Sequence, residues 1–190
     1  MKTLVLMALA ASGCFAQALV EGNPSSAVRV QIWEDLQCSD CADFRVMLDK
    51  ELLPKFKGTV AFEHRDFPLP KHAWARKAAV AARYFESISP QLAVEFRQTA
   101  MASQLKITPE NFEAHITDFA KAHKTDPAKA IAALSDKALL DRIETDYQYG
   151  IARGIARTPT VLVNGEPFIE QFAAAEIVKY IEKEVAGAPK

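Results

Sequence analysis

The sequence predicts an α/β fold in which a block of helices is inserted between two halves of one sheet. Three patterns predict it: a βαβ unit over residues 28–70, helical periodicity over 71–149, and a hairpin with a closing helix over 150–186. The chain has 190 residues, of which 49% are apolar. Those values suit one globular domain with an insertion better than two full-sized domains.

The first sheet half is predicted from two alternating segments on either side of a helix. Apolar residues recur at period two over residues 28–36, which predicts a strand. An i, i+3, i+4 rhythm then runs from Phe44 to Phe56 and reaches Gly58, as expected of a helix that ends at glycine. Residues 59–67 alternate again before two prolines, so a second strand is expected there.

The middle of the chain is predicted to contain five helices. It is rich in alanine, the residue with the highest intrinsic helix propensity. Thr108 and Asp126 each precede a proline, which puts a capping side chain before proline at the first helical position. Ser89 and Pro90 separate the first of these helices, which begins at His72, from the second, which begins at Pro90.

The second sheet half is predicted from a hairpin signal. Asn164 and Gly165 lie between the apolar segment Thr160–Val163 and a second short apolar segment, and Asn-Gly is the strongest short-range signal for a hairpin turn. Pro167 places the second arm at a sheet edge because proline cannot donate a ladder hydrogen bond. A last helix is expected over roughly residues 173–185.

The first residues have the layout of a secretory signal peptide. Lys2 precedes a short apolar run, and an Ala-x-Ala cleavage site ends at Ala18. We therefore expect residues 1–18 to be removed, 19–27 to form a linker, and the mature protein to work in the periplasm or another extracytoplasmic space. Cys14 loosely resembles a lipoprotein cysteine, but cleavage is favoured because the usual large aliphatic residue is missing. The apolar run is too short to span a bilayer, so no transmembrane segment is expected in the mature chain.

The charge balance argues against a polyanion as the partner. Lys and Arg number 23 against 24 Asp and Glu, for a formal net charge of -1. This balance provides no overall attraction to nucleic acid or to an anionic membrane surface.

Cys38 and Cys41 lie three residues apart at the predicted start of the first helix. Side chains at this spacing share one helix face, so the pair can open and close a disulfide with little backbone movement. The unpaired N–H groups and the dipole of the first helical turn favour a thiolate, and Cys38 is the better placed to benefit. The spacing therefore predicts redox chemistry.

Three other roles fit the cysteine spacing less well. A zinc site needs two more ligands, and no other cysteine survives signal cleavage, so no metal is expected. His64, His115 and His123 are expected to be partly exposed on a strand or helix. A purely structural disulfide across so short a loop adds little stability. A chaperone that holds Cu(I) on the two thiolates is ranked last.

Four local motifs connect the cysteine pair to a known family. They are Glu34-Asp35-Leu36-Gln37-Cys38-Ser39-Asp40-Cys41, Arg65-Asp66-Phe67-Pro68-Leu69-Pro70 with His72, Arg157-Thr158-Pro159-Thr160, and Val163-Asn164-Gly165. Together with the element order, they make residues 28–185 resemble the thioredoxin fold in its DsbA-like branch, which has an all-helical insertion between the two sheet halves. The resemblance implies that Cys38 is the exposed nucleophile, Cys41 the buried resolving thiol, and Thr158-Pro159 a cis peptide beside the pair.

The chain departs from this family at positions expected to tune the cysteine pKa values. Ile32 stands where many relatives have a buried acid; Glu34 is a candidate replacement, although a solvated loop acid is expected. Asp40 lies between the cysteines and is expected to raise the pKa of Cys38, which makes the pair less oxidising. Arg157 stands where glycine is common, and it would lower that pKa if it reached the sulfur, although we expect a solvated side chain.

The resemblance implies an exported thiol-disulfide oxidoreductase that acts as a disulfide donor to cysteine-containing envelope proteins. It implies no cofactor beyond the redox-active Cys38–Cys41 disulfide, and a membrane quinone-linked oxidase as the partner that reoxidises it. Two alternatives stay open. One is a reductase or isomerase that uses the same pair, and the other is a non-catalytic module that binds peptides on the thioredoxin scaffold.

Overall fold

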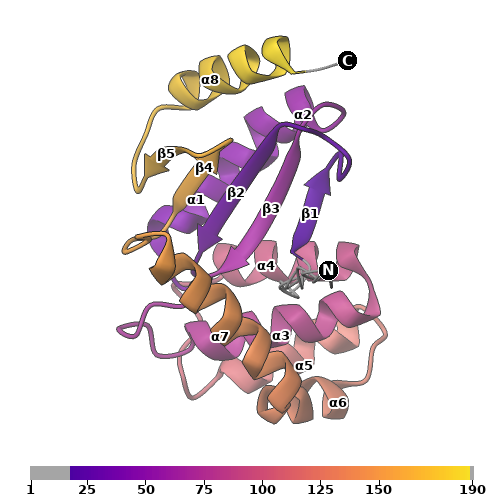
Figure 1. The fold of residues 1–190 in the computed structure, drawn as a ribbon. Helices are drawn as coiled ribbons and strands as arrows, with labels where there is room; N and C mark the ends of the chain where they lie inside the picture. Colours follow the sequence, from indigo (N-terminus) through magenta and orange to yellow (C-terminus); the bar gives the residue numbers. More distant parts are fainter. Residues whose placement is uncertain (1–17, 189–190) are drawn as a thin grey trace, which may run out of the picture.

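The computed structural model describes residues 18–188, and in it a five-stranded mixed sheet carries helices on both faces (Figure 1). The strands are β1 (Leu19–Gly22), β2 (Arg29–Glu34), β3 (Ala61–Asp66), β4 (Thr160–Val163) and β5 (Glu166–Ile169). Their order in the sheet is β1-β3-β2-β4-β5, with β2 parallel to β3 and every other neighbouring pair antiparallel. Residues 1–17 of the predicted signal peptide, Cys14 included, lie outside the described residues.

Helices connect the two halves of the sheet. The segment after β2 consists of α1 (Ser39–Met47), a π turn η1 (Leu48–Leu52) and α2 (Leu53–Phe56). The insertion contains α3 (Ala75–Ile88), α4 (Pro90–Ala102), α5 (Phe112–Ala122), α6 (Pro127–Ala132), a short 3-10 turn η2 (Ala133–Ser135) and α7 (Lys137–Ala152), and α8 (Ala174–Gly187) follows the hairpin. The α/β fold predicted from the sequence, with helices between two sheet halves, is confirmed.

Of the three helix starts predicted at prolines, those at Pro90 and Pro127 are confirmed and the one at Pro109 is wrong. The side chains of Ser89 and Asp126 accept hydrogen bonds from backbone N–H groups in the first turns of α4 and α6. At Thr108 the helix does not begin, because its N–H donates to the Asn111 side chain and its hydroxyl accepts from the Asn111 N–H. This local turn delays the start of α5 to Phe112.

The linker expected over residues 19–27 is in part a strand. Residues 19–22 form β1, which pairs antiparallel with β3, Leu19 opposite His64. Leu19 is buried against Ala93 and Val94 of α4. A four-residue strand is too short for its periodicity to be recognised in the sequence. Its pairing partner, the edge of β3, lies some forty residues later in the chain, so no local pattern indicates the pairing.

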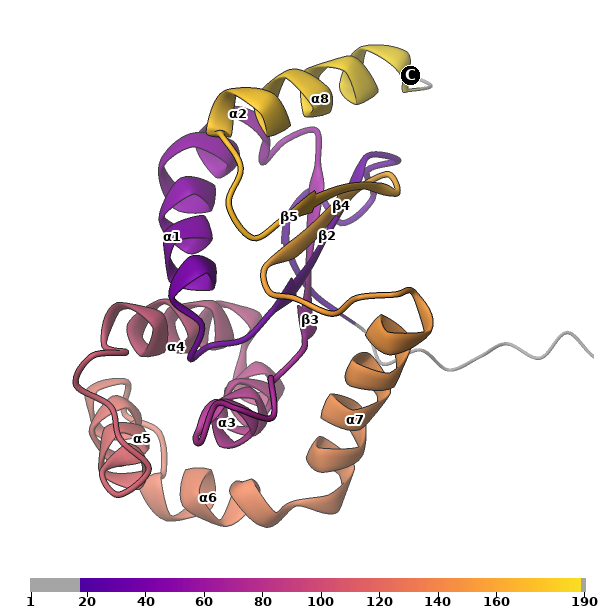
Figure 2. The ribbon, with the colours of Figure 1, turned by 90° about the vertical axis from the view of Figure 1, so that its left-hand side faces the viewer.

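Two apolar layers enclose the sheet, and Figure 2 shows α1 and α7 on opposite sides of it. On one face, strand residues such as Val30 and Val161 pack with Ile177 of α8 and with α1. On the other, Trp33 and Phe67 lie under α7. The approach of α7 requires glycine at position 150, where an added Cβ would lie 2.8 Å from the Phe67 ring and from Trp33 Nε1. The insertion has its own core, which includes Phe85, Phe96, Phe112 and Phe119.

A buried network of charged side chains joins the insertion to the sheet. Arg97 of α4 donates to Glu34 of β2 at 2.8 Å and to Asp66 of β3 at 2.6 Å. Arg83 of α3 also contacts Asp66, and it reaches Asp146 of α7 at 2.6 Å. All five side chains are buried. Helices α3, α4 and α7 are thereby tied to the two central parallel strands through paired charges.

His64 extends this network to the edge strand β1. Its Nδ1 lies 2.8 Å from Glu34 and its Nε2 lies 2.9 Å from Glu21. Burial alone would lower the pKa of His64, but the two carboxylates outweigh it and raise that pKa, so the ring is held as a cation. The expected partial exposure of His64 is therefore wrong, and so is a solvated loop position for Glu34, which is the buried last residue of β2.

Loss of Arg97 should destabilise the fold strongly. Arg97→Met keeps most of the side-chain volume but removes one of the two cations that contact each buried carboxylate, leaving His64 on Glu34 and Arg83 on Asp66. We expect a loss of about 3–5 kcal/mol in the free energy of unfolding. Arg76→Met is the matched control, because Arg76 forms an exposed ion pair with Glu144, and its loss should cost less than about 1 kcal/mol. Urea unfolding measures both, and equal losses would contradict the structural role of the network.

Candidate active site

Cys38 and Cys41 lie where β2 passes into α1. Cys38 is the N-cap residue of α1, with extended backbone, and Cys41 lies in the first turn. Both are free thiols in this structure. Cys38 keeps 8% of its surface exposed and Cys41 only 1%. Cys41 is buried as the resemblance implied, but the exposed position expected for Cys38 is wrong, because its side chain also packs in the core of the insertion and keeps only a small accessible surface.

The surroundings of Cys38 stabilise its thiolate. Its pKa is lowered to about 6, chiefly by a hydrogen bond from the Cys41 thiol, against an opposing effect of partial burial. The backbone N–H groups of Cys41 and Asp40 lower it further. These N–H groups are the unpaired donors of the first helical turn, so the predicted helix-start effect is present at this sulfur.

Cys41 has the opposite character. Burial, the hydrogen bond that it donates to Cys38 and the charge on Cys38 raise the pKa of Cys41 well above that of an ordinary thiol. The ionised Glu34 behind it raises the pKa further, and the backbone N–H of Asp35, 3.4 Å from the Cys41 sulfur, acts in the other direction. At neutral pH the pair thus carries one thiolate, on Cys38, and one proton, on Cys41.

The loop before β4 returns to this helix start from 120 residues further along the chain. The Thr158–Pro159 peptide bond is cis. The Cys38 sulfur lies 3.2 Å from the Thr158 carbonyl oxygen. Thr158 is buried, and it lines the same surface cleft as Cys38.

Asp40 and Arg157 lie beside the pair and are each held by a neighbour. Asp40 accepts a hydrogen bond from the Gln171 side chain at 3.3 Å. Arg157 forms an exposed ion pair with Glu170 at 2.6 Å, which agrees with the solvated position expected for it. The effect of the Asp40 carboxylate on the pKa of Cys38 stays a prediction.

Asp35 organises the site, although sequence reasoning assigned it no role. One carboxylate oxygen accepts from the Gln37 N–H at 2.7 Å; the other accepts from the Leu69 N–H at 2.7 Å and lies 2.8 Å from His72 Nδ1. The cysteine loop and the loop after β3 are thus fastened to one buried carboxyl group. Burial outweighs these bonds and raises the pKa of Asp35. Its position inside the cysteine motif was the signal that could have identified it.

A cleft of about 730 Å³ opens over Cys38. Its walls come from the cysteine loop, the loop after β3, the α4–α5 loop and the segment before Thr158. Gln104 fixes the α4–α5 loop, since its side-chain N–H₂ donates to the carbonyls of Leu36 and Cys38, each at 2.9 Å. The next residue, Leu105, is fully exposed at the rim. The cleft therefore presents the Cys38 thiolate and an apolar rim residue to a polypeptide.

Two further features bear on partners and cofactors. Among residues 18–188, no cluster of three or more His, Cys, Asp or Glu side chains is arranged to hold a metal ion. Within the same residues, no helix combines the length and apolar character that crossing a bilayer requires.

Comparisons with known proteins agree with this geometry. The family model described as Thioredoxin matches residues 16–183. No curated protein sequence matches the chain. Among solved structures, oxidised BdbD from Bacillus subtilis is 26% identical, with a TM-score of 0.77 over 90% of this chain and 94% of that one. Wolbachia pipientis α-DsbA1 is 18% identical (TM-score 0.78; 90% and 92% covered), and Chlamydia trachomatis DsbA is 18% identical (0.71; 97% and 96%). The fold is that of the DsbA-like proteins.

The pKa of Cys38 should control its reactivity. Alkylation by iodoacetamide should rise with pH around a midpoint near 6, because only the thiolate attacks. Cys41→Ala removes the hydrogen-bond donor and should raise the pKa of Cys38 toward the ordinary value near 8.5. Cys41→Ser keeps a donor and is the matched control. A midpoint that is the same in the wild type and Cys41→Ala would contradict the hydrogen bond.

Asp35→Asn should loosen the site. Each oxygen of Asp35 accepts a hydrogen bond from a backbone N–H. In asparagine one of these oxygens is replaced by NH₂, which is itself a donor, so one of the two hydrogen bonds is lost in either orientation of the amide. We expect a loss of about 1–3 kcal/mol in the free energy of unfolding and faster alkylation of Cys41. Asp43→Asn, an exposed acid of α1, is the control. Unfolding and alkylation that match the wild type would show that Asp35 does not fasten the loops.

Proposed function

This chain belongs to the thioredoxin family, and on that basis we propose that it is an exported thiol-disulfide oxidoreductase that works mainly as a disulfide donor. One observation carries the proposal: a thiol with a pKa of about 6 at the mouth of a cleft has a buried partner thiol whose pKa is raised. The outer sulfur, on Cys38, can therefore react with the substrate, and the inner sulfur, on Cys41, can resolve the mixed disulfide.

Disulfide donation then proceeds in two exchanges. A substrate thiolate attacks the sulfur of Cys38 in the oxidised protein, a mixed disulfide forms, and the Cys38–Cys41 bond breaks. Cys41 leaves with the electron pair and takes up a proton, because its pKa is high. A second substrate thiolate attacks the first substrate sulfur and releases Cys38 as a thiolate. The substrate loses two electrons, and the protein gains them as a dithiol.

The pKa of Cys38 favours this direction. Ionisation at a pKa of about 6 stabilises the dithiol form by about 1.4 kcal/mol at pH 7, which corresponds to about 30 mV toward a more oxidising couple. A stable leaving thiolate also speeds release of the oxidised substrate. The same pair runs in reverse as a reductase or isomerase if it is kept reduced, so the equilibrium potential decides between these roles.

The proposed partners follow from the sequence. The substrates are cysteine-containing exported proteins, and the location is the periplasm or another extracytoplasmic space, because the N-terminal residues have the pattern of a cleaved signal. A membrane quinone-linked oxidase would accept the two electrons and restore the disulfide. The redox-active Cys38–Cys41 pair itself is the only redox group that the proposal needs.

The equilibrium constant against glutathione tests the direction. A potential near that of DsbA, about -120 mV, is expected for a disulfide donor, and one near that of thioredoxin, about -270 mV, would overturn the donor assignment in favour of reduction.

Cys38→Ala separates catalysis from simple peptide binding. An oxidoreductase should lose all turnover of a reduced, unfolded substrate, because no mixed disulfide can form at the outer position. Ser87→Ala, on the exposed surface of α3, is the control. Retention of the protein's effect on its substrate in Cys38→Ala would identify a non-catalytic peptide-binding module instead.

A further inference from the structure

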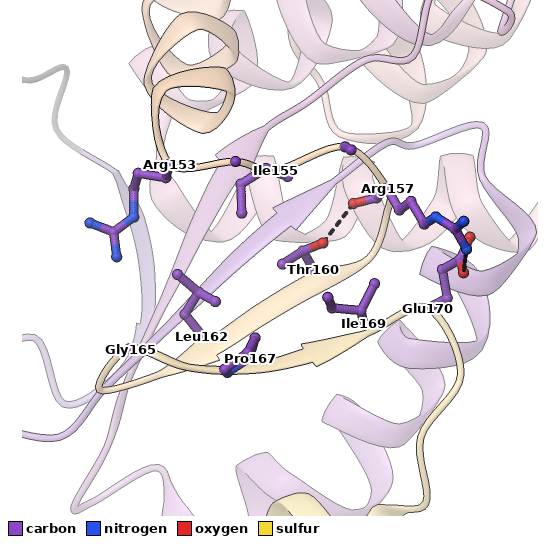
Figure 3. Close-up of a pocket in the computed structure, with 11 residues that line it drawn as sticks. Arg153, Ile155, Arg157, Thr160, Leu162, Gly165, Pro167, Ile169 and Glu170 are labelled. Atoms are coloured by element: carbon purple, nitrogen blue, oxygen red, sulfur yellow. Dashed lines mark hydrogen bonds and ion pairs between the residues drawn. The ribbon is translucent and has the colours of Figure 1, made fainter.

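A second groove lies beside the cleft, on the β4–β5 hairpin (Figure 3). It has a volume of about 610 Å³. Leu162, Pro167 and Ile169 of the hairpin line it together with Ile155 of the loop after α7, and Arg153 and Arg157 also contribute to it. A largely apolar hollow, with Arg153 and the Arg157–Glu170 ion pair at its edges, is thus open at the surface next to the active site.

The groove exists because the hairpin extends beyond the helices on that face of the sheet. Helix α7 covers Trp33 of β2 and Phe67, which follows β3, and Ile155 and Leu162 at the floor of the groove belong to the same buried cluster. The opposite face of the hairpin is closed, since Phe168 packs in the layer formed with α8. The side chain of Ile169 points to the open face and remains 49% exposed. Edge strand β5 therefore carries apolar side chains that no described element covers.

The groove and the cleft share one boundary. Ala156, Arg157 and Glu170 line both of them. Glu170 has a φ of 57°, a left-handed conformation that is uncommon for a residue other than glycine. Its N–H donates to the Pro159 carbonyl at 2.8 Å and its carboxylate pairs with Arg157. A chain that leaves the sulfur on this side crosses the Arg157–Glu170 pair and enters the groove.

Charge selects the kind of chain that would fit. Arg153 lies over the rings of Trp33 and Tyr149, which hold its guanidinium at the groove. Arg157, at the boundary with the cleft, is already paired with Glu170, so Arg153 is the cation that a substrate carboxylate would meet. An apolar side chain seated beside Arg153 is matched by a substrate in which an acidic residue neighbours the apolar one.

We propose that this groove is a second subsite for the substrate polypeptide and takes an apolar side chain, flanked by an acidic residue, from the extended segment next to the reacting cysteine. The inference rests on the proposed function, because continuity with the Cys38 cleft is what identifies the occupant. Strand β5 has four residues, a length of about 14 Å. The subsite therefore spans about four residues of extended substrate.

A peptide series tests the subsite. Each peptide contains one cysteine in a Ser/Gly background, with a single leucine moved through successive positions on either side. For the wild-type protein, kcat/KM for exchange should be about fivefold higher with leucine at the one or two positions that reach the groove than with serine there. An aspartate beside that leucine should raise kcat/KM further, and a lysine should lower it, with a difference that shrinks at high salt.

Two variants locate the preference. Ile169→Thr keeps a β-branched residue in β5 but removes apolar surface, and it should reduce the leucine-to-serine ratio to about one. Ile88→Thr is the matched control, because Ile88 is 47% exposed at the end of α3 and should leave the ratio unchanged. Arg153→Glu should reverse the preference for aspartate over lysine.

A covalent trap gives a readout that does not depend on those variants. Cys41→Ala protein, joined through Cys38 to a peptide with photoreactive leucine at the preferred position, should crosslink to residues 153–169. Crosslinks confined to Phe44, Met47 and Phe172, which line a small hollow on the other side of Asp40, would overturn the proposal. So would a wild-type protein that exchanges with every peptide at one rate. A wild-type protein that exchanges with no peptide and not with glutathione would refute the proposed function itself.

Discussion

Arg97 holds the carboxylates of Glu34 and Asp66 together inside the protein, and the relation of the helical insertion to the sheet depends on this contact. All three groups are removed from water, so each is tolerable only while its partners are in place. Arg83 repeats the arrangement between Asp66 and Asp146. The insertion cannot shift on the sheet without exposing a buried charge to an apolar surrounding, which gives the two parts one relative position.

That relative position determines the chemistry of the cysteine pair. Both cysteines belong to the core cluster of the insertion, but Cys41 is the more deeply buried and has the charge of Glu34 behind it. Cys38 lines the cleft, and backbone N–H groups and the Cys41 thiol stabilise its anion. The pKa values of two identical side chains, three residues apart, thus shift in opposite directions because Cys41 is more buried and Cys38 accepts the hydrogen bonds of the helix start.

The cleft is assembled from loops that separate contacts hold. Asp35 fastens the loop after β3, Gln104 fastens the α4–α5 loop, and Glu170 binds Arg157 and Pro159 on either side of Thr158. The first two contacts involve the cysteine motif itself, and the third holds the loop whose Thr158 carbonyl lies beside the Cys38 sulfur. Preorganisation of this kind favours a polypeptide that can lie against fixed walls and meet an already ionised thiol.

Local sequence by itself determined the cysteine spacing, the helix behind it, the breaks at Ser89 and Asp126 and the Asn164-Gly165 hairpin, because each depends on residues within a few positions of one another. Only the tertiary structure decided that Glu34 and His64 are buried ions, that residues 19–22 form a strand, that Asp35 fastens the site, and that Arg157 pairs with Glu170. These outcomes depend on side chains brought together from distant parts of the chain. The free-energy cost of burying a charge or of leaving a strand edge unpaired is offset only by a partner that the folded chain places beside it.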